Sequence, residues 1–472
     1  MLNKSEFGLL GLGVMGKSLC RNLAQKGFLL SIYNRHVDNV EEDVALNFKA
    51  QHPELESARS FDELEAFVQS IEQPRKIMLM VNAGKTTDLV IEDLLQHVSA
   101  GDVLIDGGNS HYEDTKRRSE YLKEREINFI GTGVSGGEEG ALKGPSIMPG
   151  GDPEVYKMIQ PYLEAIAAKD GNGRPCCTFI GREGSGHFVK MVHNGIEYAE
   201  MQLICEVVSV LKSQGKSNDE IADILTSWES SGSYLLEITI AILRKREGDG
   251  WLLDSILDKA GNKGTGNWTA VATAKLGVPS SLITSALYAR YSSFYKEERT
   301  TGESLYKKNR NGSSSIAEDE LAKAYEFARI INHYQGFKLI SEASKSNNWS
   351  LKLSEIARIW TNGCIIRSGL MEELISVLRE GDNLLFHKAI VEKLNNSKTA
   401  TSRVVAQSIL DEIAIPCLSE AINFFSGITT ANSSANLIQA QRDYFGAHTY
   451  QRVDDLTEKY YHTKWQEEDQ QS

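Results

Sequence analysis

The stretch FGLLGLGVMGKSLCRNLAQKG, residues 7–27, sets a glycine-rich turn between a short apolar run and a helical pattern. Its glycines follow the GxGxxG spacing that, after a strand and before a helix, is typical of a dinucleotide site. The first glycine permits a tight turn, the second lets a pyrophosphate approach the backbone, and the third lets helix and strand pack closely. The N–H groups at the helix start attract the anion. The stretch therefore predicts a nucleotide-binding turn formed by Gly11, Leu12, Gly13, Val14, Met15 and Gly16.

The pattern that begins in this stretch continues to about residue 183. Short apolar runs at residues 28–33, 76–81, 102–105, 127–131 and 177–180 alternate with helical stretches. Such alternation predicts a parallel sheet with helices on both faces, and near-continuous apolar runs fit strands that are buried on both sides. We therefore predict a Rossmann-like α/β domain with a mostly parallel sheet over residues 1–183.

From residue 184 to about 430 the sequence shows helical periodicity and no lasting strand alternation. A faint repeat runs through it, because QLICEV at 202–207 returns as KLISEA at 338–343, and Trp228 and Trp360 follow the two copies. We predict a large all-α domain at 184–430 with an internal duplication, followed by a C-terminal helix and tail at 431–472. The many aromatic residues of the tail favour burial, either against its own subunit or against a partner.

Composition and charge exclude several classes of protein. The chain has 472 residues, with 51 Lys and Arg against 64 Asp and Glu, which gives a net charge of −13. Such a chain repels phosphate polyanions, which argues against binding to nucleic acid or to anionic membranes. No apolar run approaches the ~18 residues of a membrane span, and no secretory signal is visible. The six cysteines show no CxxC pair or zinc-type spacing, so we expect a cytoplasmic protein with no metal site.

The residues at the end of the second predicted strand bear on the choice of nucleotide. An NAD site usually carries Asp or Glu there to bind the ribose 2′-hydroxyl. This chain has Asn34, Arg35 and His36 instead. A guanidinium pairs bidentately with phosphate, so the sequence favours NADP over NAD. The alternative is that Arg35 is an ordinary surface arginine.

The first helix after residue 184 concentrates polar groups on one face. At about 100° per residue, Lys190, His193, Asn194 and Glu197 fall within a ~100° arc, and apolar residues gather on another side. A solvated face with ion pairs is the commoner cause of such a stripe. The functional interpretation is that a desolvated, neutral Lys190 accepts a proton from a substrate hydroxyl. Glu197 would then act as an acid, provided that burial raises its pKa.

Several longer segments carry a resemblance to a known family. They are GLGVMG (11–16), IDGGNS (105–110), GVSGGEEGALKGPSIMPGG (133–151), KMVHNGIEYAEMQ (190–202), KGTGNWT (263–269), ARYSSFYKEER (289–299) and QAQRDYFGAHTY (439–450). Over essentially its full length the chain resembles the decarboxylating 6-phosphogluconate dehydrogenases. The resemblance implies oxidation of 6-phosphogluconate at C3 by NADP, loss of C1 as CO2 and release of ribulose 5-phosphate, within the oxidative pentose phosphate pathway.

The resemblance also implies roles for individual residues. Lys190 would be the base in the hydride step and then the acid that protonates the carbonyl oxygen, and Glu197 would protonate C1 of the enediol. The sugar acid would contact Asn109, Ser135, Gly136, Gly137, His193 and Asn194, and its 6-phosphate would contact Tyr198, Lys263, Thr265 and Arg290, with Arg442 and His448 from a second subunit. Besides residues 11–16 and 34–36, the cofactor would contact Val81, Asn82, Ala83 and Asn109. The family implies a homodimer with shared active sites, whose tail reaches the partner.

The chain departs from the family pattern at His36, where the family often has threonine, and at Asn82 and Asn267, where it often has lysine. The first two changes bear on NADP preference rather than on the chemistry. Two further hypotheses stay open at this point. One is a dehydrogenase for another hydroxy acid that releases no CO2, and the other is a catalytically silent NADP-binding protein. The latter requires Lys190 or Glu197 to be missing or misplaced, and the sequence contains both.

Overall fold

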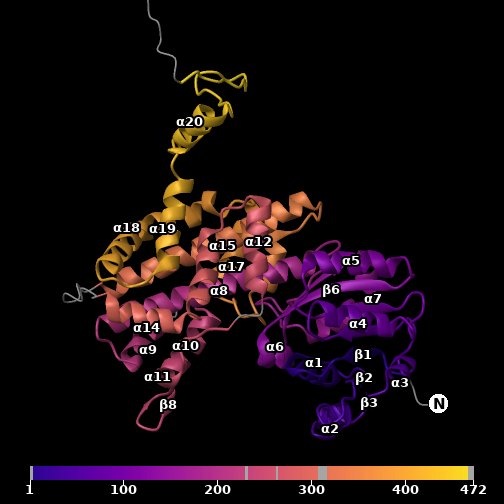
Figure 1. Ribbon diagram of the computed structural model, residues 1–472. Coiled ribbons are helices and arrows are strands. Elements are labelled where there is room, and N and C mark those ends of the chain that lie inside the picture. The colour runs from indigo at the N-terminus through magenta and orange to yellow at the C-terminus, as the bar shows by residue number, and fades with distance from the viewer. Residues whose placement is uncertain (1–3, 229–231, 262–263, 307–315, 466–472) are drawn as a thin grey trace, which may run out of the picture. The chain divides into compact units, whose positions relative to one another are not determined.

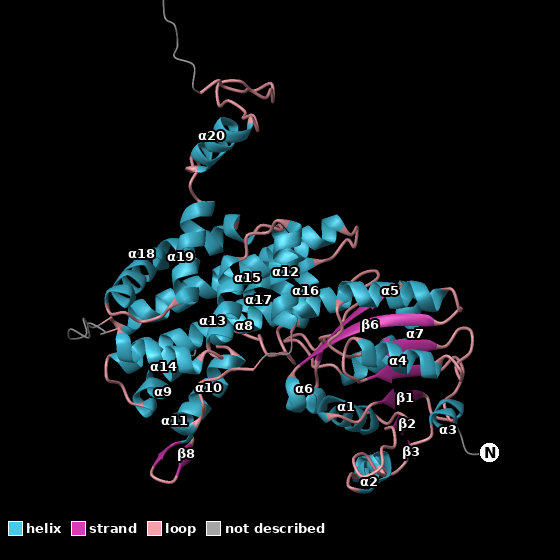
Figure 2. Ribbon diagram, viewed as in Figure 1, coloured by secondary structure: helices cyan, strands magenta, loops and turns pink. Residues whose placement is uncertain are grey.

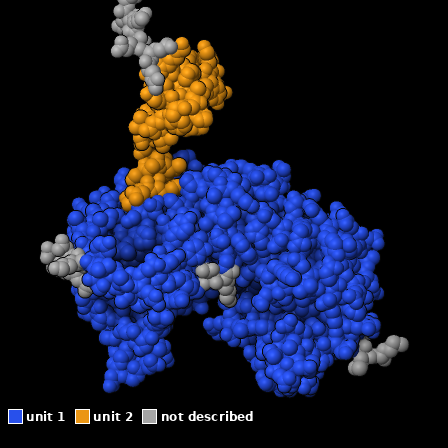
Figure 3. All heavy atoms as spheres, in the orientation of Figure 1, with its two compact units in different colours: residues 1–421 blue, residues 422–472 orange. Residues whose placement is uncertain are grey.

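The computed structural model describes residues 4–228, 232–261, 264–306 and 316–465. The chain forms two compact units, residues 1–421 and 422–472, coloured blue and orange in Figure 3. All six cysteines are free thiols. None of the described helices combines the length and the apolar character that a membrane span requires.

A sheet of seven strands is formed by the described residues of the N-terminal part (Figure 1). The strand order is β3-β2-β1-β4-β5-β6-β7, and all neighbours pair in parallel except β6 and β7. This order is that of a dinucleotide-binding sheet with one added edge strand, so the predicted Rossmann-like fold is confirmed. The strands are β1 (Phe7–Leu10), β2 (Leu30–Tyr33), β3 (Arg59–Phe61), β4 (Lys76–Leu79), β5 (Val103–Asp106), β6 (Asn128–Ser135) and β7 (Ser146–Gly151).

Side chains of the central strands alternate between two apolar clusters, one on each face of the sheet. Leu9 and Ile105 belong to one cluster, and Leu10 and Leu104 belong to the other. Because both faces are covered, these strands are apolar throughout. The helices on the first face are α1 (Val14–Gln25), α2 (Val44–Ala50), α6 (Gly137–Lys143) and α7 (Pro153–Ile166), and those on the second are α3 (Leu64–Gln69), α4 (Lys85–Leu94) and α5 (Tyr112–Lys123).

The sequence pattern missed β3 and β7, and it wrongly indicated a strand at residues 177–180. β7 reads SIMPGG, and proline and glycine are rare inside strands, but β7 lies at the sheet edge, where proline is tolerated. It runs antiparallel because the short connection through α6 cannot make the crossover that a parallel pair needs. Of residues 177–180, Cys177 alone forms a bridge, to Ile147 of β7.

A mostly helical region follows, built on two long helices of 29 residues each, α8 (Ser185–Ser213) and α15 (Glu318–Ser346). The two helices pack against each other, and α15 also packs against α18 (Figure 2). The other elements are α9 (Asn218–Ser227), α10 (Tyr234–Arg244), β8 (Arg246–Glu247), β9 (Gly250–Trp251), α11 (Leu252–Ser255), α12 (Thr265–Leu276), α13 (Ser281–Ser292), α14 (Lys296–Leu305), α16 (Leu353–Ile359), α17 (Gly369–Glu380), α18 (Lys388–Leu410), α19 (Pro416–Ile428) and α20 (Ala435–Gly446), with single 3-10 turns η1 (Pro53–Leu55) and η3 (Leu384–Phe386). The region thus also contains one short antiparallel pair of strands, β8 and β9, which the sequence pattern did not predict.

The repeat noted in the sequence corresponds to two similar sets of helices, α8-α9-α10 and α15-α16-α17. Trp228 and Trp360 directly follow the second helix of each set. Ser233 and Ser368 cap the third helices, each accepting a hydrogen bond from a backbone N–H, and an antiparallel bridge joins them. α8 also packs on β6 and β7. The helix that carries the predicted catalytic residues therefore joins the helical region to the sheet.

Candidate active site

The glycine-rich turn has the geometry that its sequence predicts. Gly11 has φ +98°, and a Cβ there would lie 2.6 Å from the Met80 carbonyl oxygen, so only glycine fits. A Cβ on Gly16 would collide with the Gly11 carbonyl oxygen, so the absence of one lets α1 lie against the end of β1. Gly13 is the N-cap of α1 and has open space on its Cβ side. The turn therefore presents the start of a helix where a pyrophosphate binds favourably.

A cavity of about 460 Å³ opens beside this turn, at the carboxyl ends of β1, β2 and β4. In open α/β sheets this is where ligands bind. The predicted cofactor contacts in its wall are Gly11, Leu12, Gly13, Asn34, Arg35, Val81 and Asn82.

The other predicted cofactor contacts lie around the same turn without lining this cavity. Val14 and Met15 begin α1, and Val14 is exposed. His36 is exposed, and its Nε2 lies 3.0 Å from Asp38 Oδ1. Ala83 lies in the turn between β4 and α4. These residues form the surroundings of the cavity rather than its wall.

The end of β2 forms a network with a carboxylate that sequence reasoning missed. Asn34 Oδ1 accepts a hydrogen bond from the Leu12 N–H at 3.1 Å, which ties the strand end to the glycine turn. Arg35 Nη2 lies 3.0 Å from Glu41 Oε1, and Asn34 Nδ2 donates to Glu41 Oε2 at 2.9 Å. These bonds from Arg35 and Asn34 hold the pKa of Glu41 below its usual value. No spacing rule marks position 41, because the loop geometry alone brings it back to the strand end.

A buried ion pair, also missed, holds the loop after β5. The Asp106 and Arg118 side chains are each 1% exposed, and Arg118 Nη1 lies 3.3 Å from Asp106 Oδ2. Asp106 also accepts hydrogen bonds from the Gly108 N–H and the Ser110 hydroxyl. Removing one partner of such a pair leaves an uncompensated buried charge. The pair therefore fixes the loop that presents Asn109.

Two glycines bring α8 close to the sheet. A Cβ on Gly133 of β6 would collide with the Lys190 side chain, and a Cβ on Gly186 would lie 2.7 Å from the Gly131 carbonyl oxygen. Side chains at these positions would push the helix outward. The close approach places His193, which contacts Lys190, against Ser135, the last residue of β6. The two glycines stand in the sequence segments GTGVSGG and GSGH, but the sequence alone predicts no role for Gly133 and Gly186.

The four polar residues predicted to share one face of α8 lie together. Lys190 Nζ is 3.4 Å from His193 Nδ1, which is 3.3 Å from Asn194 Oδ1 and 3.5 Å from Glu197 Oε2. Ser135 Oγ lies 3.1 Å from His193 Nε2. Lys190, His193 and Asn194 are buried, and the Glu197 side chain is 20% exposed. The alternative of a solvated helix face is therefore wrong.

Burial sets the protonation of these groups. It lowers the pKa of Lys190 below the usual lysine value, although the charge of Glu197 opposes the shift. It raises the pKa of Glu197, against the opposing cations of Lys190 and Arg290. Burial, assisted by the charge of Lys190, holds the pKa of His193 well below its usual value. Burial therefore shifts the amine toward its neutral form and the carboxyl toward its protonated form.

A small cavity beside Lys190 brings separate elements together. Its wall includes Asn109, Asn194 and Thr265, the first residue of α12. Further along α8, the Tyr198 ring lies under the Arg290 guanidinium, 3.7 Å from the ring centroid. Residues predicted to contact the sugar acid and residues predicted to contact its phosphate thus follow one another along α8.

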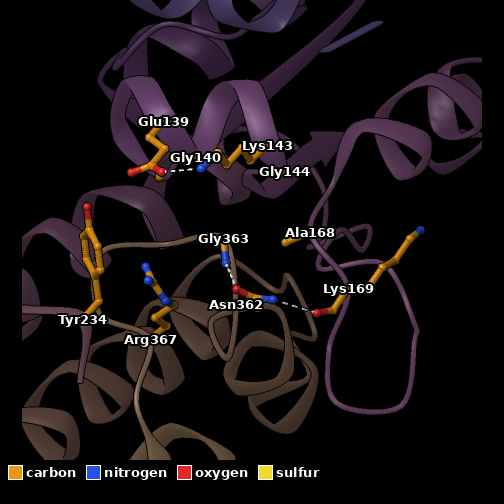
Figure 4. Close-up of a pocket in the computed structure, with 11 residues that line it drawn as sticks. Glu139, Gly140, Lys143, Gly144, Ala168, Lys169, Tyr234, Asn362, Gly363 and Arg367 are labelled. Atoms are coloured by element: carbon orange, nitrogen blue, oxygen red, sulfur yellow. Dashed lines mark hydrogen bonds and ion pairs between the residues drawn. The ribbon is translucent and has the colours of Figure 1, made fainter. Parts of the chain in front are cut away.

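Gly136 and Gly137, at the start of α6, are supported by the segment around Gly363. Gly136 has φ +127°, and a Cβ there would lie 2.6 Å from the Gly363 carbonyl oxygen. A second cavity of about 320 Å³ lies beside this contact (Figure 4). In its wall, Asn362 donates to the Lys169 carbonyl at 3.0 Å and accepts from the Gly363 N–H at 2.8 Å. We infer that the residues around this cavity hold the segment at Gly136 and Gly137 in place.

Three predicted phosphate contacts lie either outside the described residues or in the second unit. Lys263 lies outside the described residues. Arg442 and His448 belong to the second unit and are exposed. Between them, the fully buried Asp443 organises the tail, because its carboxylate is hydrogen-bonded to Thr449, His462, Thr463 and Trp465.

Family models match both halves of the chain. Residues 6–181 match the NAD binding domain of 6-phosphogluconate dehydrogenase, and residues 186–465 match the 6-phosphogluconate dehydrogenase C-terminal domain. The boundary between the two matches falls just before α8. The two matches together cover nearly all of the chain.

Relatives of similar length agree with the family models. The decarboxylating 6-phosphogluconate dehydrogenase of Bacillus licheniformis is 45% identical over 98% of this chain and 100% of that protein. The Bacillus subtilis protein, described as NADP(+)-dependent and decarboxylating, is 44% identical over 98% of this chain and 100% of its own length. The solved Plasmodium falciparum 6-phosphogluconate dehydrogenase is 37% identical and aligns with a TM-score of 0.92 over 98% of this chain and 100% of that one. On these full-length matches, the chain belongs to the 6-phosphogluconate dehydrogenase family.

Proposed function

We propose that this chain converts 6-phosphogluconate into ribulose 5-phosphate and CO2 while NADP is reduced to NADPH. The observation that carries the proposal is the placement of Lys190 and Glu197 on one face of α8, with the pKa of the amine lowered and that of the carboxyl raised. A base and an acid whose environments shift their pKa values in opposite directions suit a reaction that removes one proton and later donates another.

The residues at the glycine turn fit NADP. The open side of Gly13 gives a pyrophosphate access to the start of α1, and the adjoining cavity extends to Arg35, whose guanidinium suits a 2′-phosphate. We assign the nucleotide to residues 11–16, 34–36 and 81–83 and to Asn109. When bound, NADP supplies the acceptor for the hydride that leaves C3 of the substrate.

Lys190 begins the reaction in its neutral form. It accepts the proton of the C3 hydroxyl while the hydride leaves C3, so the alcohol becomes a ketone and the amine becomes an ammonium. Burial makes this step accessible near neutral pH, because it disfavours the charged form of the amine. His193, 3.4 Å from Lys190 Nζ, is kept neutral by burial and the nearby charge, so it holds the amine without competing for the proton.

Decarboxylation follows oxidation because the C3 ketone can receive the electrons of the breaking bond. The C1–C2 bond cleaves, CO2 leaves, and its electron pair forms a double bond between C2 and C3. Lys190 returns its proton to the C3 oxygen, which gives an enediol and a neutral amine. A 3-hydroxy acid lacks this electron acceptor, which fixes the order of the two steps.

Glu197 completes the reaction as the acid. It donates a proton to the carbon that becomes C1 of ribulose 5-phosphate, while the adjacent enediol hydroxyl gives its proton to Lys190. Burial raises the pKa of Glu197, which favours the protonated carboxyl that this step requires. After product release, one proton returns from Lys190 to Glu197, which restores both groups. The cycle releases no proton to solvent, because the carboxylate leaves as neutral CO2.

We assign substrate binding to groups around α8. Asn109, Ser135, Gly136, Gly137, His193 and Asn194 hold the carboxylate and hydroxyls, and Tyr198, Lys263, Thr265 and Arg290 hold the phosphate. The net charge of −13 means that a phosphorylated sugar acid requires local cations. We propose that Arg442 and His448 of a second copy complete this cation cluster, so that the enzyme is a homodimer with shared sites.

Cysteine chemistry supports a location in the cytoplasm. All six cysteines are free, and five of them are buried. Disulfides are rare in the reducing cytosol and common in secreted proteins. We therefore propose that the enzyme works in the cytoplasm.

The decisive experiment combines 6-phosphogluconate with NADP or NAD, follows the absorbance of the reduced nucleotide and traps CO2. We expect NADPH and CO2 in equal amounts. Reduction without CO2 would instead identify a dehydrogenase for another hydroxy acid. Binding of NADP with no reduction of either nucleotide would identify a catalytically silent protein.

A further inference from the structure

The loop after β2 folds back and returns a carboxylate to the strand end. The Glu41 N–H donates to the Val37 carbonyl at 2.8 Å, and the Val37 N–H donates to the Glu41 carbonyl at 3.0 Å. Glu41 thereby meets Arg35, whose Nη2 and Nε lie 3.0 Å and 3.4 Å from its two carboxylate oxygens. Asn34 Nδ2 donates to the same carboxylate at 2.9 Å. The guanidinium is thus already paired with an anion from its own loop.

Glu41 also lines the nucleotide cavity, together with Gly13 and Arg35. Its side chain is 32% exposed, and that of Arg35 is 67% exposed, so a ligand in the cavity can reach both. In dinucleotide sites of this fold, a carboxylate near the end of β2 binds the ribose 2′-hydroxyl, and an arginine there accommodates a 2′-phosphate. This chain brings both groups to the same place.

We propose that Glu41 is a specificity-determining residue, which competes with a 2′-phosphate for Arg35 and accepts a hydrogen bond from a free 2′-hydroxyl. The inference rests on the proposed function only in placing a dinucleotide beside residues 11–16. It predicts an enzyme that uses both NADP and NAD. The preference for NADP over NAD is smaller than it would be in the same site without the Glu41 carboxylate.

The two nucleotides make different demands on this pair. Glu41 holds the Nε and Nη2 groups of Arg35. A 2′-phosphate therefore either takes these groups from Glu41 or binds the remaining edge of the guanidinium beside the carboxylate, and in both cases the two anions repel each other across a short distance. A 2′-hydroxyl donates to Glu41 and leaves the ion pair intact. The hydrogen bonds from Arg35 and Asn34 lower the pKa of Glu41, so its charge is present at neutral pH. Asn82, where the family often has lysine, carries no charge to offset it.

The test compares E41Q with the wild-type enzyme and with E42Q. Glu42 is the matched control, because it is also exposed but accepts from the Asn39 N–H instead of Arg35. Calorimetric titration with adenosine 2′,5′-bisphosphate and with 5′-AMP measures the 2′-phosphate contribution without catalysis. In E41Q we expect the bisphosphate to bind about tenfold tighter and 5′-AMP to bind no tighter, whereas E42Q changes both by less than about twofold.

Kinetics and a second variant complete the test. The ratio of kcat/KM for NADP to that for NAD rises in E41Q through the KM values, while kcat is unchanged. In an R35M background, the E41Q change favours the bisphosphate less than it does with Arg35 present, because it relieves the repulsion between the two anions but frees no guanidinium. An E41Q enzyme that keeps the wild-type ratio of the two dissociation constants would overturn the inference alone. A wild-type enzyme that binds neither nucleotide would overturn the proposed function as well.

Discussion

The protonation states of Lys190 and Glu197 depend on each other and on their burial. Moving one proton from Glu197 to Lys190 turns a neutral pair into an ion pair without changing the net charge. Burial disfavours the charged form of each group, whereas the attraction between the two charges favours the ion pair. The two groups therefore titrate as a coupled system. A substrate anion next to Lys190 shifts this balance toward the ammonium.

Replacing Lys190 by alanine removes the proposed base. We expect kcat to fall about 10³-fold, while the dissociation constant for NADP stays within about twofold of wild type, because Lys190 lies outside the wall of the nucleotide cavity. In the wild-type enzyme, kcat/KM rises with pH as the amine loses its proton, and it levels off below the ordinary lysine range. A K190A enzyme with more than about a tenth of wild-type turnover would contradict the assignment.

Replacing Glu197 by glutamine separates the late proton donation from hydride transfer. We expect a rapid first turnover of NADPH to persist, followed by steady-state turnover slowed about 100-fold. The measurement is stopped-flow absorbance with enzyme in excess and then with substrate in excess. In the wild type, steady-state turnover falls as pH rises through the raised pKa of Glu197, and E197Q lacks this dependence. Equal loss of the first turnover would place Glu197 in the oxidation step instead.

At the residue scale, the sequence predicted the groups that follow a periodic rule. The 3.6-residue period of a helix was enough to bring Lys190, His193, Asn194 and Glu197 together. It could not predict Glu41, whose position depends on a folded-back loop with no period. The sequence therefore predicts the functional groups on α8, but it does not predict the carboxylate that the loop after β2 contributes.

The approach of α8 to the sheet depends on Gly133. We expect Gly133→Ala to lower the free energy of unfolding by about 1–3 kcal/mol, because its Cβ collides with the Lys190 side chain. Turnover falls with it, because the helix must move away from β6. The matched control is Gly171→Ala, whose Cβ meets nothing within 4 Å. Denaturant unfolding and kcat are measured for both variants, and equal behaviour of the two would show that Gly133 does not set the helix position.

The same helix anchors α19 through a buried carboxylate. Glu206 is 1% exposed and accepts hydrogen bonds from the N–H groups of Cys417 and Leu418, each at 2.9 Å. Burial raises the pKa of Glu206 to about 7, from 4.5. The folded protein therefore holds this proton while the unfolded chain has lost it, and stability falls as pH rises through that window.

Glu206→Gln removes this titration and isolates its effect. Well below pH 4.5 the wild type and the variant differ by a constant amount, because the Glu206 side chain is uncharged in both the folded and the unfolded protein. We expect the difference in Tm, variant minus wild type, to increase from about pH 5 to about pH 8. Groups common to both proteins cancel in this difference. A pH-independent difference would show that the carboxylate is ionised in the fold throughout the range.

At the element scale, the sequence predicts the central parallel strands but not β7, the strand at the edge of the sheet. Buried central strands are apolar on both faces, which their sequences show directly. β7 is stabilised by its pairing with β6 and is built from residues with low strand propensity, so only tertiary context reveals it. The apolar run at residues 177–180 had the right composition and lies along β7, where the Ile180 N–H donates to the Pro149 carbonyl at 2.8 Å. It forms one bridge, from Cys177 to Ile147, and not a continuous strand.

At the scale of the whole molecule, the second unit, residues 422–472, carries two exposed basic side chains, Arg442 and His448. Within the unit, Arg442 donates to Gln439 at 3.0 Å and the His448 ring contacts Phe445. The Asp443 carboxylate holds the tail together through hydrogen bonds with Thr449, His462, Thr463 and Trp465. Burial opposes ionisation of Asp443, but these bonds keep its pKa below the usual value, so the anchor stays charged at neutral pH. A rigid tail with exposed cations suits delivery of charge to another chain.

Mixed dimers test whether the tail serves the partner. K190A and R442A subunits, each nearly inactive as homodimers, are mixed after reversible dissociation and isolated by two affinity tags. If Arg442 completes the partner's site, the mixed dimer contains one site with both an intact Lys190 and an intact Arg442, and we expect about half the wild-type turnover per dimer. If Arg442 serves its own subunit, every site lacks one of the two groups, and activity stays at the level of the inactive parents. Recovery after mixing therefore requires both a dimer and an exchanged tail, which no assay on a single variant can establish.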